Sequence, residues 1–121
     1  RLHYAELPAH ISLGEIFAMP SRSRFFGLEV EGLGIVYLEA SSCGIPVIAG
    51  SSGGAPDAVI EGKTGFVVDG KNIDSIAQAC ISLLLNPELR QSMGVSGRRW
   101  AEESWSWSMW GKRFSALLFG E

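Results

Sequence analysis

The chain has 121 residues, of which 46% are hydrophobic and 19% charged, with a formal net charge of -3. This composition is typical of one small globular domain and argues against a disordered protein. The apolar stretches are far shorter than the roughly 20 residues of a membrane-spanning helix, and the interspersed charges lack the basic footprint of nucleic-acid binding. We also expect no signal peptide.

The first half of the chain predicts alternating helices and strands. Residues 6–11 favour a short helix with Pro8 in its first turn, and residues 15–19 favour a buried strand. The loop over residues 21–31 is longer than the about two to six residues usual in such connections. Residues 32–43 then predict a helix that ends at Gly44.

The second half continues the alternation and then becomes helical. We expect a strand over residues 46–49, a helix over 55–60 and a strand over 64–68, followed by three helices. This order predicts a Rossmann-like α/β fold in one domain over residues 1–121, with a parallel sheet and helices on both faces. Ligands bind such sheets beyond the carboxyl ends of the strands. The loops after Met19 and Ala49 are therefore the candidate binding loops.

A glycine-rich turn follows the first of these loops. Gly32 and Gly34 stand where a helix begins, and glycines there let a phosphate approach the free N–H groups of the first helical turn. The amides of Leu33 and Ile35 are thus candidate donors to a diphosphate. The plain alternative is that these glycines only make a turn.

Two glutamates flank this glycine-rich turn and strengthen the prediction of a ligand site. Glu31 precedes it, and Glu39 follows eight positions later, which along a helix is on the order of 12 Å. A carboxylate accepts two hydrogen bonds and suits a vicinal diol, on ribose or on a sugar. A structural ion pair with Arg22 or Arg24 is the alternative for either glutamate, and each arginine could equally be solvated or contact a phosphate.

The same residues carry a likeness to a known family. The motif is a Glu-x7-Glu signature in residues 31–40 (EGLGIVYLEA), followed by residues 43–49 (CGIPVIA), 53–57 (GGAPD) and 62–68 (GKTGFVV). In this order they resemble the family 4 retaining glycosyltransferases over essentially the whole chain. The amino-acid sequence of the loop before the signature is most similar to that of actinobacterial phosphatidylinositol mannosyltransferases that use GDP-mannose.

The resemblance implies the donor-binding, C-terminal half of a GT-B enzyme, with mannose passing from GDP-mannose to a lipid or glycan acceptor and no metal. It implies that Glu31 acts catalytically at the donor sugar, Glu39 holds the ribose, and the backbone from Gly32 to Ile35 binds the diphosphate. Gly27 and Leu28 would line the sugar pocket. The family also uses an Arg and a Lys on the preceding part of this domain for the diphosphate, and a whole N-terminal domain; we expect both to lie upstream of Arg1. We therefore expect no transfer by the chain alone.

Such an enzyme would be cytoplasmic, at the inner face of the plasma membrane through peripheral association. Two other functions stay open: a non-catalytic Rossmann-like interaction or regulatory domain, and a relative that processes nucleotide-free sugar phosphates. The spacing of the two glutamates favours the transferase, because a scaffold does not need both.

Other residues with chemical potential have simpler interpretations. Cys43 and Cys80 fit buried thiols in a reducing cytoplasm, and His3 and His10 lack a partner that would activate them as bases. An aromatic cluster late in the chain favours core packing between the last helices, with an exposed patch or a membrane-facing surface as alternatives; it consists of Trp100, Trp105, Trp107 and Trp110.

Overall fold

A computed structural model describes residues 3–120. Its sheet contains β1 (Phe17–Met19), β2 (Val47–Gly50) and β3 (Gly65–Val68), which are parallel and lie in the order β1-β2-β3. In the register, Ala18 lies opposite Ile48, which lies opposite Phe66. Every residue of β2 is buried, as expected of a central parallel strand covered on both faces.

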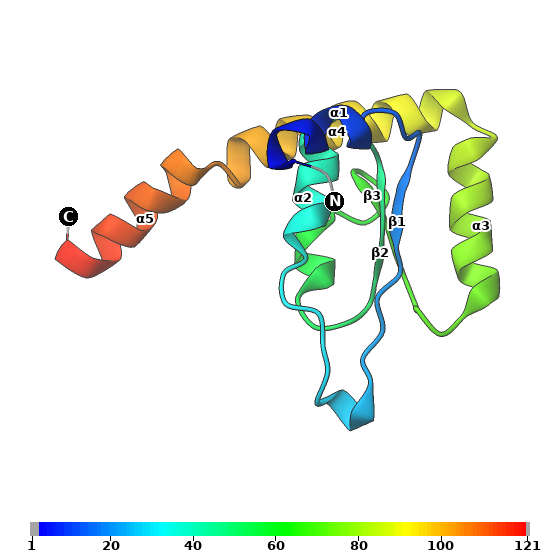
Figure 1. The fold of residues 1–121 in the computed structure, drawn as a ribbon, viewed down its shortest axis with the longest axis horizontal. Coiled ribbons are helices and arrows are strands. Elements are labelled where there is room, and N and C mark those ends of the chain that lie inside the picture. Colours follow the sequence, from blue (N-terminus) through cyan, green and yellow to red (C-terminus); the bar gives the residue numbers. More distant parts are fainter. Residues whose placement is uncertain (1–2, 121) are drawn as a thin grey trace.

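Helices surround this sheet, and their bounds follow the hydrophobic pattern of the sequence. The α-helices are α1 (Leu7–Ile11), α2 (Ile35–Ser42), α3 (Ile73–Leu84), α4 (Pro87–Ser104) and α5 (Trp107–Phe119). Three short 3-10 turns join them: η1 (Tyr4–Glu6), η2 (Phe25–Gly27) and η3 (Ala55–Ala58). In Figure 1, α2 and α3 lie on opposite sides of the strands, α4 lies across the end opposite η2, and α5 projects away.

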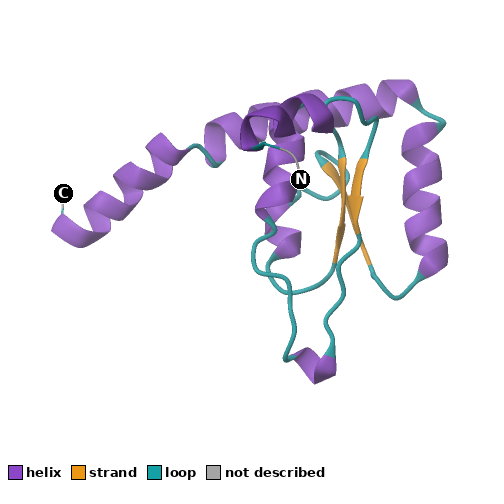
Figure 2. Cartoon of the chain, in the orientation of Figure 1, coloured by secondary structure: helices purple, strands orange, loops and turns teal. Residues whose placement is uncertain are grey.

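Two hydrophobic clusters form the core, one on each face of the sheet. Val47 and Ala49 point to the α2 face, where Tyr37 and Leu38 pack, whereas Ile48 points to the α3 face with Leu83. Figure 2 shows the strands enclosed between these helical layers. A parallel sheet with helices on both faces confirms the predicted fold class.

Two predicted helices differ from the observed elements. The helix expected over residues 32–43 begins only at Ile35, because Gly34 is left-handed (φ 71°, ψ 63°) and cannot be part of a right-handed helix. The helix expected over residues 55–60 is only η3, because Val59 is extended (φ -142°) and the Ile60 amide donates to the side chain of Thr64 instead.

The late aromatic cluster is divided between the core and the surface. Trp100 and Trp105 pack edge to face, 5.8 Å apart, against the core on the α2 face, as core packing predicts. Trp110 lies 5.6 Å from Trp105, but Trp107 is 89% exposed, so the core prediction is wrong there. The reason is that α5 has no buried residue in the part of the chain that the structure describes.

The cysteines also differ from expectation. Cys43 and Cys80 are both free thiols, but each is half-buried rather than buried. Cys43 stands at the C-cap of α2, and its thiol lies 3.8 Å from the carbonyl of Pro8 in α1. It therefore sits at the boundary between two helices instead of inside the core.

Candidate functional site

The glycine turn before α2 presents unpaired backbone donors. Gly34 is the N-cap of α2, and it has no side chain that could cap the helix. Among residues 3–120, no oxygen accepts a hydrogen bond from the backbone amides of residues 32–36, whereas the Tyr37 amide donates to the Gly34 carbonyl at 2.9 Å. Free amides at a helix N-terminus carry partial positive charge and suit an anion. The turn has the chemistry of a phosphate cradle.

The buried Tyr37 ring packs against the glycine turn and restricts its conformation. A Cβ on Gly34 would lie 2.3 Å from Cε2 of the Tyr37 ring, so only glycine fits. The Tyr37 hydroxyl donates to the Met19 carbonyl at 2.8 Å and lies 3.2 Å from Oγ of Ser21. Burial is the main reason that the pKa of Tyr37 is raised, and the negative charge of Glu31 adds to that increase. The turn is thereby connected to the carboxyl end of β1.

The loop after β2 holds Glu31 by its backbone. The Glu31 amide donates to Oγ of Ser52 at 3.2 Å, and the Glu31 carbonyl accepts from the Gly54 amide at 3.2 Å. Ser52 is 1% exposed and also lies 3.0 Å from Oγ of Ser23. Both backbone groups of Glu31 are thus satisfied, and its half-buried side chain is left available.

Close backbone packing explains the glycines of that second loop. A Cβ on Gly53 would lie 1.9 Å from the Glu31 carbonyl oxygen, and one on Gly54 would lie 2.5 Å from that of Gly32. The loop after Ala49 is one of the two candidate binding loops expected from the sequence, but the contact of Ser52, Gly53 and Gly54 with the glycine turn was not expected. The available signal was that loops after neighbouring parallel strands meet at one edge of the sheet.

Glu39 lies one helical turn beyond the glycine turn. It is half-buried on the same face of α2 as Ile35, and both line an open hollow of about 980 Å³. The rest of the lining is largely apolar and comes from the chain start, α2, the end of α4 and α5: Tyr4, Leu33, Leu38, Ser42, Ala101, Glu102, Trp105, Ser106, Trp107 and Trp110. The hollow is rich in hydrophobic and aromatic surface, with a few polar groups, as ligand sites usually are.

The structure brings some predicted site residues together and separates others. Leu33, Ile35 and Glu39 share the hollow, whereas Glu31 is absent from its lining and is bonded through its backbone amide to Ser52. Gly27 lies in η2 and Leu28 is its C-cap, both at the far tip of the loop in Figure 1, and Leu28 is 87% exposed.

The alternative of structural ion pairs finds no support in these contacts. Within residues 3–120, neither Glu31 nor Glu39 forms an ion pair. Arg24 pairs instead with Glu29, 3.8 Å away. Both proposed ligand carboxylates are therefore without a cationic partner in the described part of the chain.

The histidines have local structural roles, and the described residues contain neither a metal-binding cluster nor a membrane-spanning helix. His3 accepts from the Ala5 amide at the start of η1, and Nδ1 of His10 lies 2.8 Å from the Glu6 carbonyl. Over residues 3–120, no three His, Cys, Asp or Glu side chains gather in a way that could hold a metal ion. No helix in that range is long and apolar enough to cross a membrane.

Comparison with known proteins relates this geometry to a family. The family model for glycosyl transferases group 1 matches residues 1–100. The chain is 56% identical over 115 residues to a GDP-mannose-dependent alpha-(1-6)-phosphatidylinositol monomannoside mannosyltransferase of Mycolicibacterium smegmatis, covering 95% of the chain and 30% of that relative. It is 49% identical over 121 residues to a GDP-mannose-dependent monoacylated alpha-(1-6)-phosphatidylinositol monomannoside mannosyltransferase of Corynebacterium glutamicum, covering 100% of the chain and 32% of that relative.

A solved structure supports the same relationship at the level of the fold. The sucrose-phosphate synthase of Thermosynechococcus elongatus superposes with a TM-score of 0.79 at 26% identity, over 100% of this chain and 30% of that one. The chain thus spans about a third of the length of the relatives that it matches.

Proposed function

We propose, from the premise that this chain belongs to the glycosyl transferases group 1 family, that it is the donor-binding part of a longer retaining mannosyltransferase. That enzyme would have the GT-B architecture and would transfer mannose from GDP-mannose to a phosphatidylinositol mannoside lipid. The named activities of the two mannosyltransferase relatives support this donor and acceptor. The remaining domain would lie in the two thirds of the relatives that the chain does not cover.

The observation that carries the proposal concerns residues 3–120, within which the amides of residues 32–36 are unpaired and the two flanking carboxylates have no cationic partner. The amides would bind the diphosphate of GDP-mannose, because they supply several aligned donors at one helix end. Glu39 would accept hydrogen bonds from the ribose diol, and Glu31 would accept them from hydroxyls of the mannose ring. We carry these roles from the family that the sequence resembles.

Glu31 is suited to contact the reacting sugar because its backbone is fixed. Ser52 and Gly54 bond both of its backbone groups, so the carboxylate is positioned before the donor arrives. Gly27 lies in η2 and Leu28 is its C-cap, and η2 lies at the outer end of the loop over residues 21–31. Their proposed contacts with the sugar therefore require this end of the loop to bend toward the glycine turn.

The cations for the leaving group would come from outside the chain. Among residues 3–120, no Lys or Arg lines the hollow that contains Glu39. Amides alone give limited stabilisation to the charge that develops on a departing diphosphate, a contribution usually worth several kcal/mol. We therefore predict that the 121-residue chain binds donor weakly and transfers no mannose by itself. We propose that transfer needs no metal and takes place at the cytoplasmic face of the membrane, where the lipid acceptor lies.

Ligand-observed NMR on the chain tests the proposed site. GDP and GDP-mannose should both give saturation transfer to their ribose protons. Glu39→Gln should weaken both ligands by roughly ten- to a hundredfold, the effect of losing a hydrogen bond to a charged group. Glu31→Gln should weaken GDP-mannose while leaving GDP unchanged, because GDP has no sugar to contact it.

The exposed Glu88 provides the matched control, and Glu88→Gln should bind both ligands as the unmodified chain does. Wild-type affinity in the Glu39→Gln variant would contradict the site. Binding of mannose 1-phosphate without any binding of GDP would favour the sugar-phosphate-processing alternative, and binding of neither would favour a non-catalytic interaction domain.

A further inference from the structure

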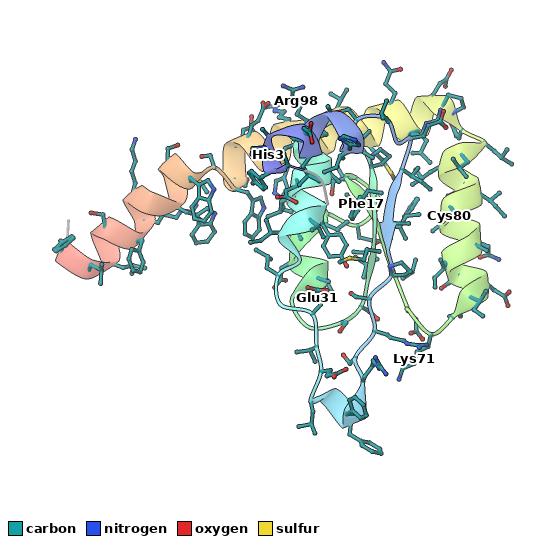
Figure 3. All side chains as sticks on the ribbon, viewed as in Figure 1. His3, Phe17, Glu31, Lys71, Cys80 and Arg98 are labelled. Atoms are coloured by element: carbon teal, nitrogen blue, oxygen red, sulfur yellow. The ribbon has the colours of Figure 1, made fainter. Side chains whose placement is uncertain are left out.

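The loop before the glycine turn carries a second feature, a group of cations and phenylalanines next to the Gly27 and Leu28 that the donor site would use. We call residues 22–28 together with Lys71 the loop tip. The loop tip encloses an open hollow of about 640 Å³, and the described residues that line it include three cations and no acid: Arg22, Ser23, Arg24, Phe25, Phe26, Gly27 and Lys71. Figure 3 shows this segment protruding from the domain, with Lys71 beside it.

The aromatic rings of the loop tip are displayed to solvent. Phe26 is 112% exposed, Phe25 is 60% exposed, and Leu28 beside them is 87% exposed. Both phenylalanines have left-handed backbone conformations, with φ of 48° and 56°, which are strained for bulky residues. The chain accepts this strain without burying either ring, so the arrangement contributes nothing to the hydrophobic core.

Backbone pairing holds the rings in this outward position. The Arg24 amide donates to the Glu29 carbonyl at 2.9 Å, and the Glu29 amide donates back to the Arg24 carbonyl at 3.2 Å. The Arg24 side chain also pairs with Glu29 and lies over the Phe25 ring, 5.4 Å from its centroid. Arg22 and Lys71 form no ion pair with any described residue, and they are left to meet an external anion.

We infer that the loop tip is a membrane-docking surface for a bilayer that contains anionic phospholipids. Phe25 and Phe26 would enter the headgroup boundary, while Arg22 and Lys71 contact lipid phosphates. Exposed apolar groups next to unpaired cations fit this occupant better than a soluble anion, which would leave the rings in water. The inference rests on the proposed function, because a lipid acceptor requires the enzyme to meet a membrane.

The position of the loop tip suits that role. It lies beyond the carboxyl ends of the strands, on the same side of the domain as the glycine turn (Figure 1). A bilayer docked there would bring acceptor headgroups toward the donor sugar. The exposed apolar face of α5 is the competing surface, but it continues into the hollow that contains Glu39, whose carboxylate has no cationic partner among residues 3–120 and repels anionic lipids.

Sedimentation of the 121-residue chain with vesicles tests this inference. The chain should bind phosphatidylcholine vesicles that contain phosphatidylinositol more tightly than pure phosphatidylcholine vesicles. The double substitution R22Q/K71Q should lower binding to the anionic vesicles about thirtyfold, the loss expected for two cations at such a surface. Phe26→Ser should lower binding to both kinds of vesicle by about tenfold or more.

Matched controls lie on α5, where Phe114 is 64% exposed. Phe114→Ser and Lys112→Gln should each change vesicle binding less than about twofold, the change expected where no group enters the bilayer. Equal binding by the wild type, Phe26→Ser and R22Q/K71Q would overturn the inference, as would a loss confined to the α5 variants. Because the loop-tip side chains are exposed, their variants should unfold at the wild-type denaturant concentration.

The same samples separate this inference from the proposed function. The loop-tip variants should keep wild-type saturation transfer from GDP, since they leave the glycine turn and Glu39 intact. A chain that binds anionic vesicles through the loop tip but gives no signal with GDP would overturn the donor site alone. A chain that binds GDP but shows no preference for anionic vesicles would overturn the docking surface alone.

Discussion

Substituting alanine for Gly34 tests whether Tyr37 fixes the shape of the phosphate cradle. Two separate penalties apply to Gly34→Ala. A left-handed backbone (φ 71°) costs a residue with a Cβ about 1–2 kcal/mol. The new Cβ would also lie 2.3 Å from Cε2 of Tyr37 and 2.5 Å from its Cδ2. No real contact is that short, so the turn or the ring must move.

The ring has little freedom to move, because its hydroxyl is bonded to the Met19 carbonyl and lies beside Ser21. Overpacking a closely packed site costs about 1–3 kcal/mol. Together the two penalties predict a loss of about 2–5 kcal/mol in the free energy of unfolding. Since the amides of residues 32–36 must shift with the turn, affinity for GDP should fall as well.

Gly44 allows the two penalties to be separated. It is also left-handed (φ 75°), but nothing lies within 4 Å of its Cβ position. Gly44→Ala should therefore lose only about 1–2 kcal/mol and keep its affinity for GDP. In a Tyr37→Leu background, the cost of Gly34→Ala should fall toward that of Gly44→Ala. Urea unfolding measures these changes. Equal costs for Gly34→Ala and Gly44→Ala in the unmodified chain would refute the role assigned to Tyr37.

Four further substitutions test the packing of the site, the packing of α4 and the helix propensity of α5. Tyr37→Phe should lose about 0.5–1.5 kcal/mol at neutral pH, because the hydroxyl no longer donates to the Met19 carbonyl, which keeps its bond from the Ser21 amide at 2.7 Å. Because burial raises the pKa of Tyr37, the stability of the unmodified chain should fall as pH rises above about 10, and less so in this variant. Ser52→Ala should cost about 1–3 kcal/mol in urea unfolding and weaken GDP-mannose binding more than GDP binding, since the Glu31 amide loses its acceptor. Gly94→Ala should lower the free energy of unfolding in urea by at least about 1–3 kcal/mol, because a Cβ there would lie 2.1 Å from the carbonyl oxygen of Gly44. Gly111→Ala is the matched control, since nothing lies within 4 Å of its Cβ position, and it should raise the helix content measured by circular dichroism.

Much of the fold was predictable because its signals are local. The continuous apolar run of β2 predicts a strand buried on both faces, and the 3.6-residue spacing of α3 predicts a helix packed by one side. Helix boundaries were less accurate, since the conformation of Gly34 depends on the ring of Tyr37 beneath it. The exposure of Trp107 was also unpredictable from pattern alone, because it depends on what α5 packs against.

The sequence by itself determined which chemistry the chain carries: glycines at a helix start, two glutamates eight positions apart, and the order of strands and helices. Only the tertiary structure decided how Glu31 is held, which residue supports the glycine turn, and that the loop tip keeps its aromatic rings in solvent. The physical reason is the distance along the chain between the residues that decide each feature. Helix starts and apolar periods depend on neighbouring residues, whereas the contact of Ser52 with Glu31 exists only because β1 and β2 pair side by side and bring their loops together.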